Sequence, residues 1–389
     1  MELRLILPCF IAFFLIRFNA FGQIDTTKKP DAKLSSKSML KDTLDQKLDF
    51  SRFLIDANGF IPVPFIVTEP ALGGFGLAVV PMFLTPKKRP QGFSGYIPPD
   101  ITAGFGLYTA NNSWALGGIR IGSFPATGIK YRVGGGIADL NLSFYRQTEN
   151  VGEKEFAFSV NTIPIILSFS KRVLKQDVYL GLQYFFAKNK LTALFADSLP
   201  QSIDSDTFNS NIGSLGLFGD WDKRDNFFTA DQGFRINALY TLNDSWTGSD
   251  FSYQRLSGFI NWFIPFEKRW ISGFRAETNF VFGDPPFYVL PSLAMRGVPA
   301  VRFQGHTTAL LETEQRVDFN LRWSAVAFAG IGKAWQPEES FGESQTAYNF
   351  GGGFRYLIAR AFRIRAGIDI AKGPDSFGWY IVFGHNWNR

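Results

Sequence analysis

"WISGFRAETNFVFG", residues 270–283, alternates between apolar and polar side chains along most of its length. The apolar set is Trp270, Phe274, Ala276, Phe280 and Phe282, and the polar set is Arg275, Glu277 and Asn279. Successive side chains of a β-strand point to opposite faces, so this period of two predicts a strand with one apolar and one polar face.

The same alternation recurs toward the C-terminus. In "TAYNFGGGFRYLI" (346–358) and "FRIRAGIDIA" (362–371), aromatic or branched residues share one face, while Arg355 and Asp369 lie on the polar faces. The chain has 43 Phe and 38 Gly among 389 residues, a composition typical of strands and tight turns. We predict about sixteen strands, beginning near residues 61, 74, 101, 113, 129, 155, 177, 208, 233, 251, 270, 308, 323, 347, 362 and 376.

Two all-β architectures accommodate strands of this kind. In a soluble sandwich the apolar faces form the core, whereas in a transmembrane antiparallel β-barrel they face lipid and the polar faces line the lumen. The strands are about ten residues long, with aromatic residues near their ends. Residues 1–22, described below, are predicted to be a leader that would export the chain. No run of 18 apolar residues follows that leader, which argues against transmembrane helices. We therefore predict an outer-membrane barrel.

The N-terminal region divides into two segments. Residues 1–22 combine an early Arg4, an apolar stretch and small residues at Ala20 and Gly22, which predicts a secretory signal peptide that contains the only cysteine, Cys9. Residues 23–57 are polar and rich in Lys, Asp and Ser, so we predict a flexible periplasmic tail. Residues 58–389 would form the barrel.

Composition also limits the kinds of function. The net charge of +6 comes without a basic block, so we expect no nucleic-acid partner. Only His306 and His385 are present, so a His-based metal site or a Ser-His hydrolase is poorly supplied. We expect no metal site, no cofactor and no catalytic residues. We expect His306 to be solvated and His385 to lie at the membrane interface. The chain is therefore not expected to be an enzyme.

One long loop interrupts the strands. "LPSLAMRGVPAVRFQG" (290–305) carries Arg296 and Gly297 between the eleventh and twelfth strands. A loop this long in a compact array is usually either functional or disordered. The next strand sends four ionisable residues to one face, which cannot face lipid and must line the lumen. These four are Glu312, Glu314, Arg316 and Asp318. Phe328 and Gly330 of the thirteenth strand point the same way.

The segment "MRGVPAVRFQG" (295–305) resembles the Arg-Gly loop of the bacterial surface antigen superfamily, the BamA/TamA-type outer-membrane barrels. The resemblance implies a sixteen-stranded barrel whose loop folds into the lumen, with Arg296 held by a carboxylate and stacked on Phe328. Glu312 matches the first family carboxylate, and Gly330 occupies the position of the second. We therefore expect Arg296 to pair with Glu312, with Glu314 as a further partner, and the loop to act as a plug.

A second segment, "DWDKRDNFFTADQGF" (220–234), resembles another motif of the same superfamily. The matching residues are Asp222, Arg224, Asp225, Asn226 and Gly233. A polar turn between two strands is the alternative interpretation of this stretch.

The resemblance implies a protein that assists insertion or translocation of proteins, or of lipid, at the outer membrane. Its partners would be outer-membrane lipids and unfolded outer-membrane or secreted polypeptides. Residues 23–57 are too few for a POTRA domain, so a separate periplasmic partner would take that role. The alternative is a passive or gated channel, or a structural barrel.

Overall fold

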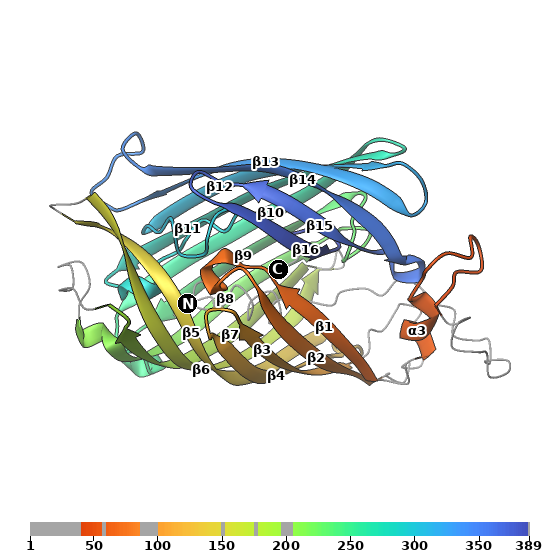
Figure 1. Cartoon of the computed structure of the whole chain (residues 1–389). Coiled ribbons are helices and arrows are strands. Elements are labelled where there is room, and N and C mark those ends of the chain that lie inside the picture. The colour runs from red at the N-terminus through yellow and green to blue at the C-terminus, as the bar shows by residue number, and fades with distance from the viewer. Residues whose placement is uncertain are drawn as a thin grey trace.

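Sixteen antiparallel strands follow one another in sequence order around a barrel (Figure 1). The structure is a computed structural model that describes residues 40–56, 60–85, 100–148, 152–174, 178–195 and 205–387. The strands are β1 (Phe60–Val67), β2 (Gly76–Thr85), β3 (Asp100–Thr109), β4 (Trp114–Phe124), β5 (Ile129–Thr148), β6 (Gly152–Leu174), β7 (Val178–Ala193), β8 (Asn209–Asp222), β9 (Gly233–Asn243), β10 (Tyr253–Glu267), β11 (Trp270–Gly283), β12 (Thr307–Asp318), β13 (Trp323–Trp335), β14 (Gln345–Ala359), β15 (Ile364–Lys372) and β16 (Phe377–Phe383). Each predicted start lies within three residues of the observed one, so the predicted strand count is confirmed.

Helical structure in the described residues is confined to short segments. These are α3 (Ser51–Asp56) and the 3-10 turns η1 (Pro70–Leu72), η2 (Ser205–Phe208), η3 (Ser245–Thr247), η4 (Phe287–Val289) and η5 (Arg360–Phe362). None of the described helices has the length and apolar character needed to cross a bilayer.

The two faces of the strands have the polarity of a membrane barrel. On β11, Phe274 and Phe282 point outward and are 43% and 57% exposed, whereas Arg275 and Asn279 point inward and are 2% exposed each. An exposed apolar surface around a buried polar interior is the reverse of a soluble sandwich, and it suits a wall that faces lipid. The sandwich alternative is therefore rejected.

The barrel has two different mouths. Most of the short turns, such as those after β10 and β12, lie at one mouth, and the long connections after β7 and β11 lie at the other. Short turns are periplasmic in outer-membrane barrels, so we call the first mouth periplasmic and the second extracellular. Helix α3 lies at the periplasmic mouth (Figure 1).

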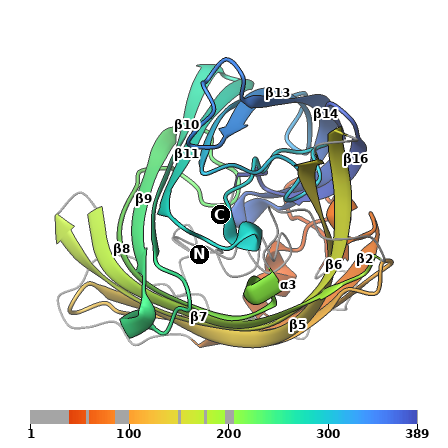
Figure 2. The same cartoon turned by 90° about the vertical axis from the view of Figure 1, so that its left-hand side faces the viewer.

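The segment between β11 and β12, residues 284–306, lies within the ring of strands, and we call it the lumen loop (Figure 2). Its η4 turn packs into the largest apolar cluster of the interior, beside Phe144 and Phe158 of the long strands β5 and β6. Leu293, Met295 and Val298 of the same loop form a second cluster with residues of β12, β13 and β14. Two apolar clusters thus anchor the loop inside the lumen.

The first and last strands meet without a backbone ladder. Every pair of neighbours from β1–β2 to β15–β16 is hydrogen bonded, but the described residues show no such pairing between β1 and β16. Phe65 and Phe383 touch across this junction, with ring centroids 5.4 Å apart. These are also the two shortest strands, with 8 and 7 residues. We call this junction the seam.

Residues 40–56 differ from the predicted flexible tail. Lys41 and Leu48 pair as an antiparallel bridge, and α3 follows. The Phe50 amide donates to the Ile358 carbonyl of β14 at 2.6 Å, which fixes the segment against the barrel. The tail prediction is therefore wrong for this part, and the rest of the predicted tail, residues 23–39 and 57, lies outside the described residues. We call residues 40–56 the N-terminal clip.

Candidate functional site

The lumen loop is itself a hairpin with a tight tip. Its arms are joined by the Leu293 amide, which donates to the Phe303 carbonyl at 3.0 Å. At the tip Gly297 has φ +80°, and a side chain there would lie 2.9 Å from backbone atoms of Lys372 and Gly373. Glycine is required here both for the left-handed conformation and for the close approach to the β15–β16 loop.

Arg296 projects from this tip into a buried pocket of charges and is 2% exposed. Its Nη1 donates to Asp369 Oδ2 of β15 at 2.6 Å. Its Nη2 lies 2.9 Å from Glu314 Oε2, an ion pair without hydrogen-bond alignment. The guanidinium also stacks over the Phe328 ring, 3.4 Å from the centroid. A buried guanidinium needs such partners, because an unpaired buried charge is costly.

The predicted pair between Arg296 and Glu312 is wrong. Glu312 accepts instead from Arg275 of β11 and, at 3.3 Å, from the Asn349 amide of β14. Asp369 is the carboxylate that the prediction missed. The alternation of residues 362–371 places Asp369 on the polar face of its strand, but the sequence carries no signal that Arg296 is its partner.

Gly330 shows why the carboxylate comes from another strand. It lies directly opposite Glu312 in the β12–β13 ladder. A Cβ at this position would come within 2.5 Å of Glu312 Cγ and 2.7 Å of Asn349 Oδ1, so no acidic side chain fits there. Asp369 takes the place of that acid and also accepts from Arg355 Nη2 at 2.9 Å. One carboxylate thus pairs with two buried guanidiniums.

The loop tip also bridges the seam on the extracellular side. The Gly297 amide donates to the Tyr380 hydroxyl of β16 at 2.8 Å, and Ser376 donates to the Gly297 carbonyl. A few residues farther along, the Ala300 amide donates to Glu69 Oε1, in the loop that follows β1, at 3.2 Å. Backbone groups of the lumen loop, bonded to side chains on both sides of the seam, therefore connect two strands that share no backbone ladder.

The second predicted motif forms the β8–β9 turn at the periplasmic mouth. Asp222 accepts from Arg224 through Nε at 2.9 Å and Nη2 at 2.7 Å. Asn226 caps the turn by accepting from two backbone amides, and its own amide donates to the Phe362 carbonyl at 3.3 Å. Asp225 accepts from Arg363 at 2.6 Å. The motif residues therefore join this turn to the β14–β15 turn.

Gly233 ends the same turn in the left-handed region, with φ +98°. A side chain there would overlap the Lys223 carbonyl oxygen, so this position also requires glycine.

The C-terminal segment turns into the lumen after β16. Gly384 has φ +77°, and beyond it Trp387 is 1% exposed against Phe263 and Ala230. His385 is 4% exposed, and its Nε2 lies 3.1 Å from Arg224 Nη1. The expectation of a histidine at the membrane interface is therefore wrong. Burial and then the charge of Arg224 hold the pKa of His385 well below its usual value.

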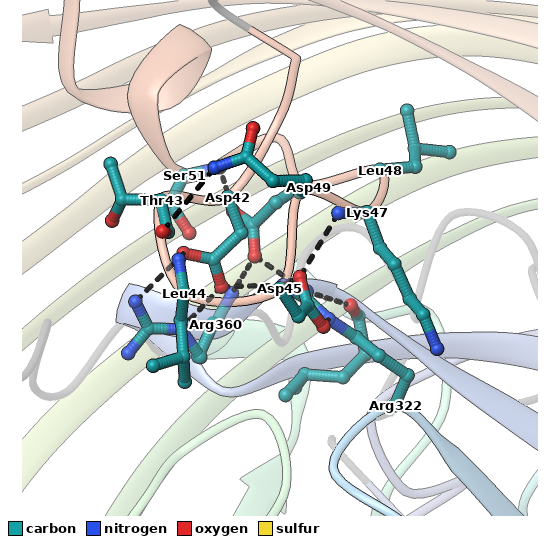
Figure 3. A network of polar contacts seen from close by, with 12 residues as sticks. Asp42, Thr43, Leu44, Asp45, Lys47, Leu48, Asp49, Ser51, Arg322 and Arg360 are labelled. Atoms are coloured by element: carbon teal, nitrogen blue, oxygen red, sulfur yellow. Dashed lines mark hydrogen bonds and ion pairs between the residues drawn. The ribbon is translucent and has the colours of Figure 1, made fainter.

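The N-terminal clip is attached by a compact charge network (Figure 3). Arg322, in the β12–β13 turn, has a fully buried side chain, and oxygens of Asp42, Asp45 and Asp49 lie 2.5, 2.7 and 2.6 Å from its nitrogens. Arg360 of η5 adds a second ion pair to Asp42 at 2.5 Å. Within the described residues no cluster of His, Cys, Asp and Glu is arranged to hold a metal ion. Here the carboxylates pair with guanidinium groups.

The clip also ties the start of β1 to strands on the far side of β16. Helix α3 ends at Asp56 and β1 begins at Phe60. The Arg360 amide and the Ala361 amide donate to Asp49 and Ser51 of the clip, at 3.0 Å each. The seam is thus bridged at the periplasmic mouth by the clip, as it is bridged at the extracellular side by the lumen loop.

We expect the clip to detach in acid. Hydrogen bonding to Arg360 holds the pKa of Asp42 well below its usual value of 3.8. Burial opposes ionisation of Asp49, but hydrogen bonds from Ser51 and Arg322 still lower its pKa. A carboxylate with a lowered folded-state pKa stabilises the fold above its unfolded pKa, and this stabilisation is lost as the pH falls through the folded value.

Amide hydrogen exchange of residues 40–56 should therefore be constant from neutral pH down to about pH 4, once corrected for intrinsic rates, and should accelerate below that. Protection in strands such as β6 is the internal control. Clip protection that is unchanged at pH 2.5 would contradict the role of these carboxylates.

No family model matches the chain, and no curated protein matches it in sequence. Among solved structures, BamA from Haemophilus ducreyi lacking POTRA domains 1–3 is similar over 84% of this chain and 69% of that chain, with a TM-score of 0.56 and 14% identity. CdiB from Escherichia coli is similar over 83% of this chain and 62% of that chain, with a TM-score of 0.57 and 12% identity. CdiB from Acinetobacter baumannii is similar over 90% and 71%, with a TM-score of 0.52 and 9% identity. This chain therefore has the fold of an outer-membrane β-barrel of the BamA and CdiB type.

Proposed function

We propose that this barrel assists the insertion or translocation of polypeptides at the outer membrane. The observation that carries the proposal is the seam, where β1 and β16 adjoin without a ladder. Strand edges with free backbone groups pair readily with other extended chains. A barrel that can part at the seam would offer such an edge to a polypeptide while its remaining fifteen ladders stay intact.

The lumen loop supports this function over the alternative of a passive channel. Its apolar residues are buried in two clusters, and Arg296 joins β13 and β15 through Phe328 and Asp369. A free solute path needs an open lumen, whereas a plug anchored at several points obstructs one. We propose that Arg296 is the latch of this plug.

The predicted leader, residues 1–22, fits a location in the outer membrane, because it would export the chain. A periplasmic partner that delivers polypeptides would complete the proposed activity, and the clip and the β8–β9 turn lie at the mouth where such a partner would bind.

The test reconstitutes the purified protein in proteoliposomes and follows the folding of a urea-unfolded outer-membrane barrel chain. We expect the protein to accelerate folding at least roughly tenfold over empty liposomes, which corresponds to lowering the barrier by about 1.4 kcal/mol. A Phe65→Cys/Phe383→Cys variant provides the seam control, because these side chains touch across it. Joining the two cysteines with a short bismaleimide should abolish the acceleration, and the unlinked variant should retain it.

A cross-linked barrel that is as active as the unlinked one would rule out opening at the seam. Steady single-channel conductance of the wild-type protein, without any acceleration of folding, would favour the passive channel.

A further inference from the structure

We infer that an incoming polypeptide strand pairs with the edge of β16, and that two prolines close the edge of β1 to such pairing. The inference deepens the proposed function by assigning the interaction surface and the chemistry of the partner. It rests on the directions in which the backbone groups of β1 point, which follow from its register with β2.

The register fixes these directions. Pro62 lies directly opposite Pro81 in the β1–β2 ladder. In an antiparallel ladder, opposite residues either exchange two N–H···O bonds or point their backbone groups away from each other. Neither proline has an N–H to donate, so this pair must be of the second kind. The backbone of Pro62 therefore points away from β2 and toward the seam.

Alternate residues of a strand point their backbone groups to the same side. The backbone N–H and C=O positions of Phe60, Pro64 and Ile66 consequently face the seam, as those of Pro62 do. Two of these four positions have no N–H, and they are adjacent positions on that edge. A strand added to β1 would leave two of its own carbonyl groups without donors. Proline at an edge strand is a known device against unwanted pairing.

The edge of β16 has no such interruption. Its sequence, FGWYIVF, contains no proline, so every residue that faces the seam keeps its N–H. β16 pairs with β15 alone among the described strands. Its edge ends where Gly384 turns the chain into the lumen. The two sides of the seam therefore differ, and only β16 offers a continuous set of donors and acceptors.

The partner that fits this edge is an extended segment of about seven residues with alternating side chains. On β16, Trp379 and Phe383 point outward and are each 37% exposed. A strand beside them lies in the same wall, so its outward residues must be apolar and its inward residues can be polar. Strands of other outer-membrane barrels have this pattern.

The experiment uses single-cysteine variants in a Cys9→Ser background, reconstituted in proteoliposomes. Ile66→Cys reports on β1 and Trp379→Cys on β16, and the native side chains have matched exposures of 40% and 37%. The probe is a synthetic peptide with the β15 sequence, residues 364–372, carrying Cys in place of Ile370. β15 pairs with the opposite edge of β16, where Ile370 lies directly across from Trp379, so the peptide has a side-chain alternation that suits a neighbour of β16. Disulfide formation under mild oxidation is quantified by mass.

We expect at least tenfold more cross-linking at Trp379→Cys than at Ile66→Cys. Adding Pro62→Val and Pro64→Val should raise cross-linking at Ile66→Cys severalfold, because it restores two donors to β1. Pro164→Val, in the interior strand β6, is the matched control and should change neither value.

Equal or greater cross-linking at Ile66→Cys in the presence of both prolines would overturn the assignment. Absence of cross-linking at both sites would overturn it as well. In either case, persistent acceleration of barrel folding would leave the proposed function standing, whereas loss of both signals would reject the two together.

Discussion

Asp369→Asn is expected to free the tip of the lumen loop. Asparagine keeps the size of the side chain but removes the negative charge that Arg296 and Arg355 share. Removing one partner of a buried ion pair costs about 3–5 kcal/mol, because the remaining charge stays desolvated. Glu314 lies beside Arg296 without hydrogen-bond alignment, so it cannot fully replace the lost carboxylate.

The readout is the labelling rate of a cysteine at the loop tip. Val298 is 3% exposed, so a Val298→Cys reporter in a Cys9→Ser background should react with a maleimide only when the tip opens. A loss of about 3 kcal/mol corresponds to labelling roughly a hundredfold faster, since each 1.4 kcal/mol is a factor of ten in an equilibrium constant. Openings in planar-bilayer conductance should become frequent at the same time.

Asp220→Asn is the matched control. It removes a carboxylate of the same kind from a buried Asp–Arg pair, with Arg235, in the part of the wall formed by β8 and β9. It should leave Val298→Cys labelling close to the wild-type rate. If both variants label equally fast, the barrel wall as a whole is loosened and Asp369 is not a specific anchor of the loop.

Arg322→Ala is expected to release the N-terminal clip entirely. The guanidinium is the common partner of Asp42, Asp45 and Asp49, and without it three carboxylates would lie close together, with Arg360 still paired to Asp42. The clip is only 17 residues long, from Leu40 to Asp56, and has no core of its own to compensate. A loss of about 3–5 kcal/mol at a buried ion pair therefore exceeds what so short a segment can supply by itself.

Hydrogen exchange at neutral pH measures this release directly. When the clip is attached, the amides of Asp42 and Asp49 donate to carbonyls within the clip, and the Phe50 amide donates to the Ile358 carbonyl of β14. These three amides should therefore lose protection in Arg322→Ala. Arg363→Ala is the control at the same mouth, because Arg363 is half-exposed and pairs with Asp225 of the β8–β9 turn. Full clip protection in Arg322→Ala would show that the backbone contacts alone hold the segment.

The two variants address the two ends of one junction. The seam has no backbone ladder, yet the lumen loop connects Tyr380 to Glu69 at one mouth, and the clip connects the start of β1 to Arg360 at the other. Side-chain contacts can be broken and remade without unfolding a strand. This arrangement is consistent with a seam that opens while the rest of the barrel persists.

The sequence by itself determined the barrel and its inside and outside. Alternation along a strand is local, since Phe274 and Arg275 must point to opposite faces wherever the strand is placed. Lipid then decides which face is outward, because buried charges such as Arg275 and Glu312 are tolerated only in the lumen. These two rules are enough to predict sixteen strands and to place Asp369 on the polar face.

Only the tertiary structure decided which of these inward residues meet. Whether Arg296 reaches Glu312 or Asp369 depends on how the loop tip descends across a lumen lined by many carboxylates, and no pattern in the chain encodes those distances. The clip is a similar case, because Asp42 and Arg322 are far apart in sequence and a short polar segment resembles a flexible tail until its partner is known. Alternation is a property of neighbouring residues, whereas ion pairing across the barrel depends on register and closure, which arise only when all sixteen strands are assembled.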